Sequence, residues 1–175
     1  NITDELIHEI AINAKMIKYI DVPLQHASDS VLKRMNRKGT GQSYLELINK
    51  LRGRVPSIAI RSTFITGFPG ESEEDFEKLV KFINDAKLDN AGFFKYSREE
   101  DTPSHRLDGH MLESIKTKRL KKLYSVQKKV AKQNCKNKVG RAYKVLAEGF
   151  DFDRLMYYGR AYFNAPDIDG KIYFF

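Results

Sequence analysis

The sequence has almost no cysteine, since Cys135 is the single one among 175 residues. A single cysteine excludes an internal disulfide, so the fold must be held together by noncovalent packing. Because Cys135 lies in the charged stretch KKVAKQNCKNKVG, we expect it at a solvent-facing position of a helix.

The sequence also lacks long hydrophobic runs. No apolar run approaches the roughly 18 residues that a membrane-spanning helix needs, and the N-terminal residues do not have the layout of a signal peptide. We therefore expect a cytoplasmic protein with no membrane partner. The first residue is Asn1 rather than methionine, and the last residues, KIYFF, have a strand-like pattern, so we expect both ends to be cut from a longer chain.

Positive charge, in contrast, is abundant: 31 lysines and arginines face 23 acidic residues, which gives a formal net charge of +8. A basic balance of this size indicates an anionic partner. Many of the cations fall in KTKRLKKLYSVQKKVAKQNCKNKVGR, residues 116–141. Two interpretations of this stretch stay open: an ordinary solvated helix face, or a surface that binds RNA or an RNA-rich particle through phosphate contacts.

Hydrophobic periodicity in the first hundred residues predicts alternating helices and strands. Helical patterns and strand patterns follow one another in the order 1–18, 19–24, 28–35, 44–55, 56–66, 72–88 and 90–97. Pro23 removes a backbone donor and should mark the end or an irregular position of the first strand. This alternation is typical of an α/β fold with a parallel sheet or barrel.

The three expected strands end on polar or glycine-rich residues, at Gln25-His26, at Gly67 to Glu71 and at Tyr96-Ser97-Arg98. In a parallel sheet these carboxyl ends meet at one rim, where binding and catalytic groups usually lie. Two structural explanations remain open: the polar side chains cap backbone groups, and GFPGE is a turn before a helix. The functional alternative is that glycines let the main chain approach a ligand beside free helix amides.

The remainder of the chain differs in composition. A basic helix is expected from Met111 to about Lys138, with an uneven apolar stripe that suits a connector. Beyond it, RAYKVLAEGF and RLMYYGRAYFNAP read as strands, DIDG as a turn and KIYFF as the start of a third strand. Three strands are too few for a small closed barrel, so we expect this second domain to be incomplete.

Three motifs, in this order and spacing, resemble the radical S-adenosylmethionine methylthiotransferases: YIDVPLQHASDSVLKRMNRKGT, TFITGFPGESEEDF and FFKYSREEDTPS. The likeness covers most of the chain. It implies the C-terminal half of a partial radical-SAM (β/α) barrel in residues 1–109, a linker helix in 110–138, and the first part of an OB-like TRAM β-barrel in 139–175. PLQH and GRAYFNAPDIDG resemble the branch whose members modify an aspartate of ribosomal protein S-twelve.

The resemblance implies a demanding chemistry. Such enzymes use S-adenosylmethionine and a 4Fe-4S cluster to generate a radical that abstracts hydrogen from an unactivated carbon, and a second 4Fe-4S cluster assists addition of a methylthio group. Since this chain has no three-cysteine loop, we expect the cluster ligands to precede Asn1, no metal site within residues 1–175, and no catalysis by this segment alone. Ribosomal protein S-twelve or the small ribosomal subunit is the implied partner, with RNA contacts through the basic helix and TRAM.

By position in the motifs, the resemblance assigns seven residues to cofactor binding: Gln25, His26, Arg37, Ile65, Gly67, Tyr96 and Ser97. Gln25 and His26 would line the cofactor end of their strand. Arg37 is implied to pair with the methionyl carboxylate, because a guanidinium matches a carboxylate through two hydrogen bonds. Ile65 and Gly67 would pack near the adenine.

Tyr96 and Ser97 would close the rim at the last strand. Two departures from the family pattern affect neighbouring residues. The widespread GxIxGxxE pattern appears as TFITGFPGE, with Thr63 in place of the first glycine and an extra residue before Glu71, so we expect Glu71 to cap its helix. The frequent EGTxA appears as EDTPS, with Asp101 in the glycine position.

Two other functions stay open at this point. The first is methylthio transfer to transfer RNA, which the net charge favours and APDIDG disfavours. The second is a noncatalytic module that binds RNA or the ribosome.

Overall fold

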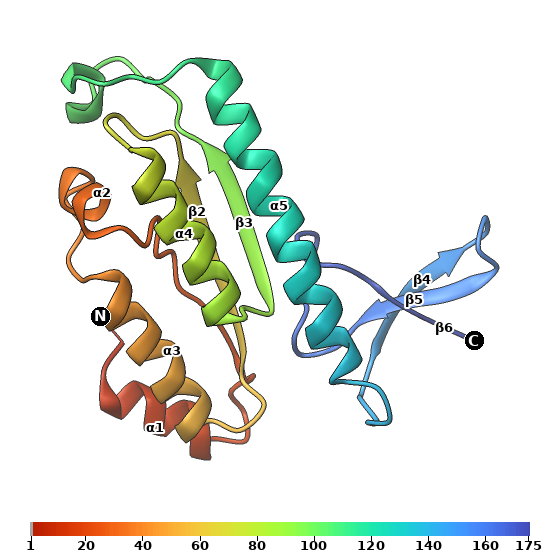
Figure 1. Ribbon diagram of the computed structural model, residues 1–175. Coiled ribbons are helices and arrows are strands. Elements are labelled where there is room, and N and C mark those ends of the chain that lie inside the picture. Colours follow the sequence, from red (N-terminus) through yellow and green to blue (C-terminus); the bar gives the residue numbers. More distant parts are fainter. Residues whose placement is uncertain (1) are drawn as a thin grey trace.

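A computed structural model describes residues 2–175 of the chain (Figure 1). The helices are α1 Asp4–Ile12, α2 Asp29–Arg34, α3 Gly41–Arg54, α4 Glu73–Ala86, the 3-10 helix η1 Pro103–Arg106 and α5 Glu113–Lys136. The strands are β1 Tyr19–Asp21, β2 Ala59–Thr66, β3 Asn90–Lys95, β4 Leu146–Asp151, β5 Met156–Arg160 and β6 Ile172–Phe174. The order of elements up to β3 confirms the alternation predicted from the sequence.

Strands β1, β2 and β3 form a parallel sheet in that order. β1 stops at Asp21, two residues before Pro23, and pairing resumes only as an isolated bridge between Gln25 and Phe64. Pro23 therefore interrupts the ladder, as the sequence predicts. The architecture is α/β, with this parallel sheet and a separate small antiparallel sheet, as expected for part of a radical-SAM barrel followed by TRAM strands.

The core lies between the sheet and its helices. Phe64 in the middle of β2 is fully buried and contacts the rings of Phe82 on α4 and Phe93 on β3, with centroids 6.0 and 5.8 Å away. Alternate residues of β2 point to this core, while those between them are only half-buried. The second face of the sheet is more open, and Phe94 there is 59% exposed.

The helix starts follow capping rules. Ser72 and Asp75 form a reciprocal capping box at the start of α4, and the Thr3 hydroxyl accepts from the amide of Leu6 at α1. The expectation of a helix through residue 18 is wrong. α1 ends at Ile12 because Asn13 adopts an extended conformation, and its side chain accepts from the Lys15 amide.

Figure 1 shows α5 alongside β3 and, to the right of the C-terminal half of α5, the antiparallel sheet of β4, β5 and β6. The strand predicted at residues 154–166 is shorter in the structure, because β5 ends at Arg160 and residues 161–170 form a loop that contacts residues next to the parallel sheet. In this loop the Tyr162 hydroxyl donates to the Ser57 carbonyl at 2.8 Å. Within residues 2–175, no helix is both long and apolar enough to cross a membrane.

Candidate functional site

The carboxyl ends of the three parallel strands lie side by side, as predicted. The Gln25 amide donates to the Thr63 carbonyl at 2.9 Å, and the Ile65 amide donates to the Gln25 carbonyl at 2.8 Å. On the other side of β2, the Tyr96 amide donates to the Thr66 carbonyl at 2.9 Å. Main-chain hydrogen bonds thus bring the strand ends of Gln25, Ile65 and Tyr96 to one rim.

Gln25 has an unusual backbone at this rim. Its φ is +72°, in the left-handed region, and the His26 amide donates to the Leu24 carbonyl two residues earlier. A three-residue turn with positive φ at a non-glycine residue is strained. Such strain persists only where neighbouring contacts enforce it, and it is concentrated at functional sites.

His26 lies behind the rim rather than on it. Its side chain is fully buried, and its Nδ1 accepts from the Ser28 amide at 3.0 Å, which leaves the proton on Nε2. Nε2 has no hydrogen-bond partner among residues 2–175, and Glu71 Oε1 is 3.9 Å away. His26 therefore stabilises the backbone behind the rim through its hydrogen bond with the Ser28 amide.

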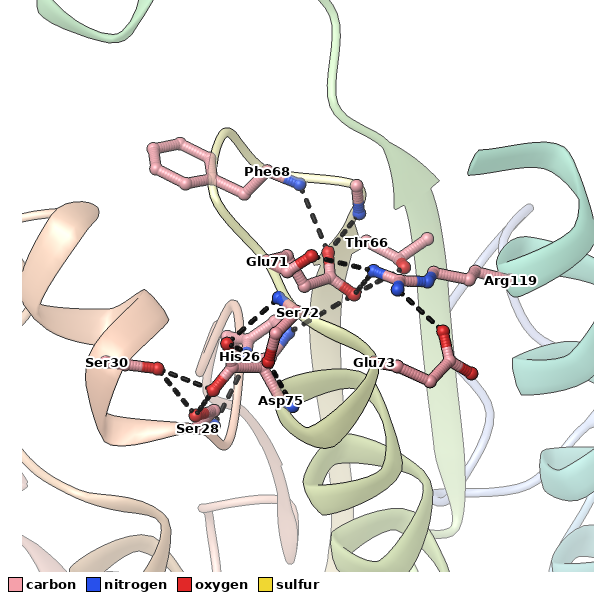
Figure 2. Close-up of polar contacts among 11 residues, drawn as sticks. His26, Ser28, Ser30, Thr66, Phe68, Glu71, Ser72, Glu73, Asp75 and Arg119 are labelled. Atoms are coloured by element: carbon pink, nitrogen blue, oxygen red, sulfur yellow. Dashed lines mark hydrogen bonds and ion pairs between the residues drawn. The ribbon is translucent and has the colours of Figure 1, made fainter. Parts of the chain in front are cut away.

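Glu71 organises the glycine-rich loop after β2. Its carboxylate accepts from the amides of Gly67 and Phe68 and from the Thr66 hydroxyl, which closes the loop on itself (Figure 2). The expectation that Glu71 caps the next helix is wrong. Ser72 occupies the N-cap position, because its hydroxyl accepts from the Asp75 amide while the Glu71 side chain points back into the loop.

A basic residue from α5 neutralises the Glu71 carboxylate. Arg119 Nη1 lies 3.0 Å from Glu71 Oε1, and Nη2 lies 2.8 Å from Glu73 Oε2 (Figure 2). The guanidinium also lies over the Phe76 ring, 5.0 Å from its centroid. Both Arg119 and Glu71 are buried, so this ion pair and its hydrogen bonds compensate each other's desolvation.

Lys116, one turn earlier on α5, covers the rim from the same side. Its Nζ donates to the Tyr96 carbonyl at 3.0 Å and lies 5.5 Å from the centroid of the Tyr96 ring. A Cβ added to Gly67, whose φ is +76°, would lie 2.5 Å from Lys116 Cγ. Gly67 therefore allows close packing of the Lys116 stem, and its own amide faces Glu71.

The sequence did not identify Lys116 and Arg119 as site residues, because they stand among many exposed cations of the linker. One signal was present. Both continue the buried stripe of α5 at helical spacing toward Leu123, Val126 and Val130.

A small apolar cluster lies at the rim. Its buried members are Val31, Phe68 and Tyr96, with Met35, Ile65 and Leu107 packed against them. The Tyr96 ring meets Phe68 edge-on at 5.1 Å, and its buried hydroxyl has no hydrogen-bond partner among the described residues. Apolar side chains beside a hydroxyl that lacks a partner suit contact with a ligand that combines an aromatic and a polar part.

The last two predicted site residues are exposed. Arg37 follows α2 and makes no ion pair with any residue between 2 and 175. Ser97 follows β3, and its hydroxyl donates to Glu99 Oε1 at 2.6 Å. Arg34, the last residue of α2, reaches the glycine-rich loop, since its Nη1 is 3.4 Å from the Pro69 carbonyl oxygen.

Asp75 forms a second polar cluster beside the rim. Its carboxylate accepts from the hydroxyls of Ser28, Ser30 and Ser72 at 2.5, 2.6 and 2.8 Å (Figure 2). Burial alone favours the protonated acid, but these hydrogen bonds outweigh burial and hold the pKa of Asp75 well below its ordinary value. Ser28 occupies the N-cap position of α2 without a side-chain hydrogen bond to that helix, and its hydroxyl instead joins α2 to α4.

The described residues 2–175 contain no group of three His, Cys, Asp or Glu side chains that could hold a metal ion. Cys135 is exposed on α5, as predicted.

Comparisons with known proteins agree with the fold. A family model described as the Radical SAM superfamily matches residues 1–83, and one described as the TRAM domain matches residues 139–175. Three proteins described as ribosomal protein uS12 methylthiotransferase RimO are similar over nearly the whole chain. Those from Clostridium botulinum (strain Eklund 17B / Type B) and Alkaliphilus oremlandii are 49% and 45% identical over 99% of it, and the one from Clostridium kluyveri is 49% identical over 98%.

The chain spans 38%, 40% and 38% of the length of these three relatives. The matched region combines radical SAM and TRAM segments in the order that the structure shows. The chain therefore belongs to the radical SAM methylthiotransferases of the RimO type.

Proposed function

We propose that the protein of which this chain is part adds a methylthio group to the β-carbon of an aspartate in ribosomal protein S-twelve. The observation that carries the proposal is the 49% identity to a protein described as RimO, which extends over 99% of the chain and includes its TRAM segment. A ribosomal substrate would place the enzyme in the cytoplasm, with ribosomal protein S-twelve or the small subunit as its partner.

S-adenosylmethionine and two 4Fe-4S clusters, with ligands outside this chain, would supply radical formation and the sulfur chemistry. The residues present fit the nucleoside part of this cofactor. The buried Tyr96 hydroxyl has no partner among residues 2–175, and Ile65 lies in the adjoining apolar cluster. The exposed Arg37 guanidinium can bind a carboxylate through two hydrogen bonds.

We propose different roles for the seven residues assigned to cofactor binding. Arg37 would hold the methionyl carboxylate, Ile65 and Tyr96 would contact the nucleoside, and Gln25 and Ser97 would complete the rim. His26 and Gly67 would act as positioning residues, because the His26 side chain is buried and the Gly67 amide faces the Glu71 carboxylate. Apolar walls around the cofactor would exclude water from a reactive carbon centre.

The domain limits 1–109, 110–138 and 139–175 are part of the proposal. The linker would join the barrel segment to TRAM, and its lysines would contact RNA. Exposed lysines without ion pairs to residues 2–175 lie along its outer side: Lys118, Lys121, Lys122, Lys128, Lys129, Lys132 and Lys136.

The test is mass spectrometry after reaction of the full-length protein, reconstituted anaerobically with iron and sulfide and supplied with S-adenosylmethionine and reductant. Ribosomal protein S-twelve and transfer RNA are offered in parallel. A methylthio mass gain on the protein's aspartate is expected. Gain on transfer RNA alone would assign the protein to the other branch. Absence of gain on both substrates together with absence of deoxyadenosine would favour a noncatalytic module that binds RNA or the ribosome.

A further inference from the structure

A groove follows the last turns of α5 at the end of the sheet opposite the candidate cofactor site. One hollow of about 370 Å³ is lined by residues that include Lys129 and Gln133, and a second of about 430 Å³ extends to Tyr162. The two hollows share Lys87, Asn134 and Asn137, so they form one continuous groove. We name this surface, from Lys129 to Tyr162, the base groove.

The base groove is strongly positive. Its lining contains five cations, Arg52, Lys87, Lys129, Lys138 and Arg141, and one acid, Asp89. Among these five, within the described part of the chain, only Lys138 is neutralised, since its Nζ lies 3.2 Å from Asp89 Oδ1. Lys129 and Arg141 are exposed and make no ion pair with residues 2–175. Unpaired cations on both sides of a groove attract an anionic chain rather than a single small ion.

Arg52 contributes its charge without an ion pair to any acid among residues 2–175. Its Nη1 and Nη2 each lie 2.7 Å from a carbonyl oxygen at the C-terminal end of α4, those of Ala86 and Lys87. These hydrogen bonds fix the guanidinium in place at the groove wall. A cation held in position costs little conformational entropy when it binds an anion.

Aromatic rings form the end of the base groove. Phe163 contacts Tyr143 and Tyr162 edge-on, with centroids 5.1 and 5.2 Å away, and Tyr162 is 37% exposed. The amide side chains of Asn134 and Asn137 lie along the same wall. A positive groove that ends on aromatic rings is typical of surfaces that bind single-stranded nucleic acid, because bases stack on the rings while cations contact phosphates.

The base groove and the candidate cofactor site lie at opposite ends of the parallel sheet. The lining of the base groove includes Ala59, the first residue of β2, and Asp89, which directly precedes β3. The candidate cofactor site lies at the opposite ends of these strands. A ligand in the base groove would therefore anchor a substrate particle and take no part in the reaction.

We propose that the base groove binds a single-stranded RNA segment, with Lys129, Lys87 and Arg141 on the phosphates and a base against Tyr162. The proposal rests on the proposed function only for the origin of the RNA, since a ribosomal substrate would bring RNA to the enzyme. RNA binding itself requires neither clusters nor S-adenosylmethionine. It can be measured separately from methylthio transfer.

The experiment measures the anisotropy of a fluorescent 12-nucleotide oligouridylate with the full-length protein at several salt concentrations. The double variant Lys129→Gln/Arg141→Gln should weaken binding about tenfold and reduce the slope of log K against log salt by about 0.7 for each phosphate that the variant no longer neutralises. The matched control, Lys33→Gln/Arg106→Gln, removes one exposed lysine and one exposed arginine that make no ion pair with residues 2–175 and lie outside the base groove. It should weaken binding less than about threefold.

A second pair of variants tests whether the aromatic ring of Tyr162 contributes to RNA binding. Tyr162→Phe keeps the ring and removes the hydroxyl that donates to Ser57, whereas Tyr162→Leu removes both. Tyr162→Phe should bind RNA nearly as the parent does, and Tyr162→Leu should lose about tenfold in affinity. Thermal unfolding of each variant shows whether it is folded.

Three results would overturn the proposal, whatever the outcome for methylthio transfer. The first is an equal loss of affinity in the two double variants, which indicates diffuse charge attraction. The second is tighter binding of duplex RNA or of a polyglutamate peptide of equal length than of the oligouridylate. The third is no binding of the oligouridylate at low salt.

Discussion

Arg119 on α5 and Glu71 after β2 form a buried ion pair, although 48 residues separate them in the sequence. The pair fixes α5 to the loop that contains Gly67 and Phe68. Because the same carboxylate binds the amides of that loop, the shape of the rim depends on a contact with α5.

Replacement of Glu71 tests this dependence. Glu71→Ala leaves the Arg119 guanidinium buried without its main partner, and loss of one member of a buried pair costs about 3–5 kcal/mol. We expect a corresponding fall in the free energy of unfolding, measured with urea at pH 7. The control is Glu73→Ala, which removes the exposed partner of Arg119 and should cost less than about 1 kcal/mol. Equal, small losses would show that the buried pair is not important.

Asp75 gives a prediction for pH dependence. Its pKa is lowered in the folded protein, so its contribution to stability is fully present above its ordinary pKa of 3.8 and is lost as the pH falls below that value. Asp75→Asn should cost about 1.5–3 kcal/mol at pH 7, because four charge-assisted hydrogen bonds, three from serine hydroxyls and one from the Ser72 amide, are weakened.

The measurement for Asp75→Asn is urea unfolding of parent and variant from pH 7 to pH 3. The difference between their free energies of unfolding should become smaller below about pH 4. Asp85→Asn, on the exposed side of the same helix, serves as the control and should differ little from the parent. A difference that is constant with pH would contradict the role given to the Asp75 charge.

Replacement of glycine by alanine should have opposite effects on stability at Gly67 and at Gly53. Gly67→Ala places a Cβ 2.5 Å from Lys116 Cγ at a residue with φ of +76°, so it should lower the melting temperature and move Lys116 away from Tyr96. Gly53 lies in α3, and a Cβ added there would meet nothing within 4 Å. Gly53→Ala should therefore raise the free energy of unfolding by about 0.5–1 kcal/mol. Calorimetry of both variants checks the predictions, and stabilisation by Gly67→Ala would contradict the packing.

Asp169 attaches the TRAM segment to the parallel sheet. Its Oδ2 accepts from the Tyr19 hydroxyl, the Asn90 side-chain amide and the Ala165 backbone amide, each at 2.8 to 2.9 Å. Burial and the neighbouring Asp169 raise the pKa of Tyr19, which keeps its hydroxyl protonated as a donor. Asp169→Ala should make residues 139–175 more sensitive to limited proteolysis.

Asp169→Asn keeps one oxygen that can accept these hydrogen bonds and should largely restore resistance to proteolysis. Asp153→Ala removes an exposed acid of the same domain and should leave the digestion rate unchanged. If all three variants are digested at the same rate as the parent, Asp169 does not hold the two parts together.

The sequence was sufficient to predict the order of helices and strands up to β3 and the rim at the carboxyl ends of the parallel strands. Local signals specify these features: helical and strand periodicity and the break at Pro23. The meeting of Gln25, Ile65 and Tyr96 follows from the rule that parallel strands share one carboxyl edge.

The polar network behind the rim could not be predicted in the same way. Its interactions join residues far apart in the chain, so no local pattern reports that Glu71 faces Arg119. Departure from a family motif suggested a helix cap for Glu71, whereas two loop amides and a guanidinium compete more effectively for its carboxylate. Residues 161–166 were predicted as strand and instead belong to a loop, whose hydrogen bonds with Ser57 and Asn90 are also long-range.

The helix α5 is bound near both of its ends. Lys116 donates to the Tyr96 carbonyl near one end, and Asn134 donates to the Leu88 carbonyl near the other. Each residue inserted between these points would rotate the second attachment by about 100° and advance it by about 1.5 Å. Evolution can therefore change the length of this helix only in steps close to whole turns.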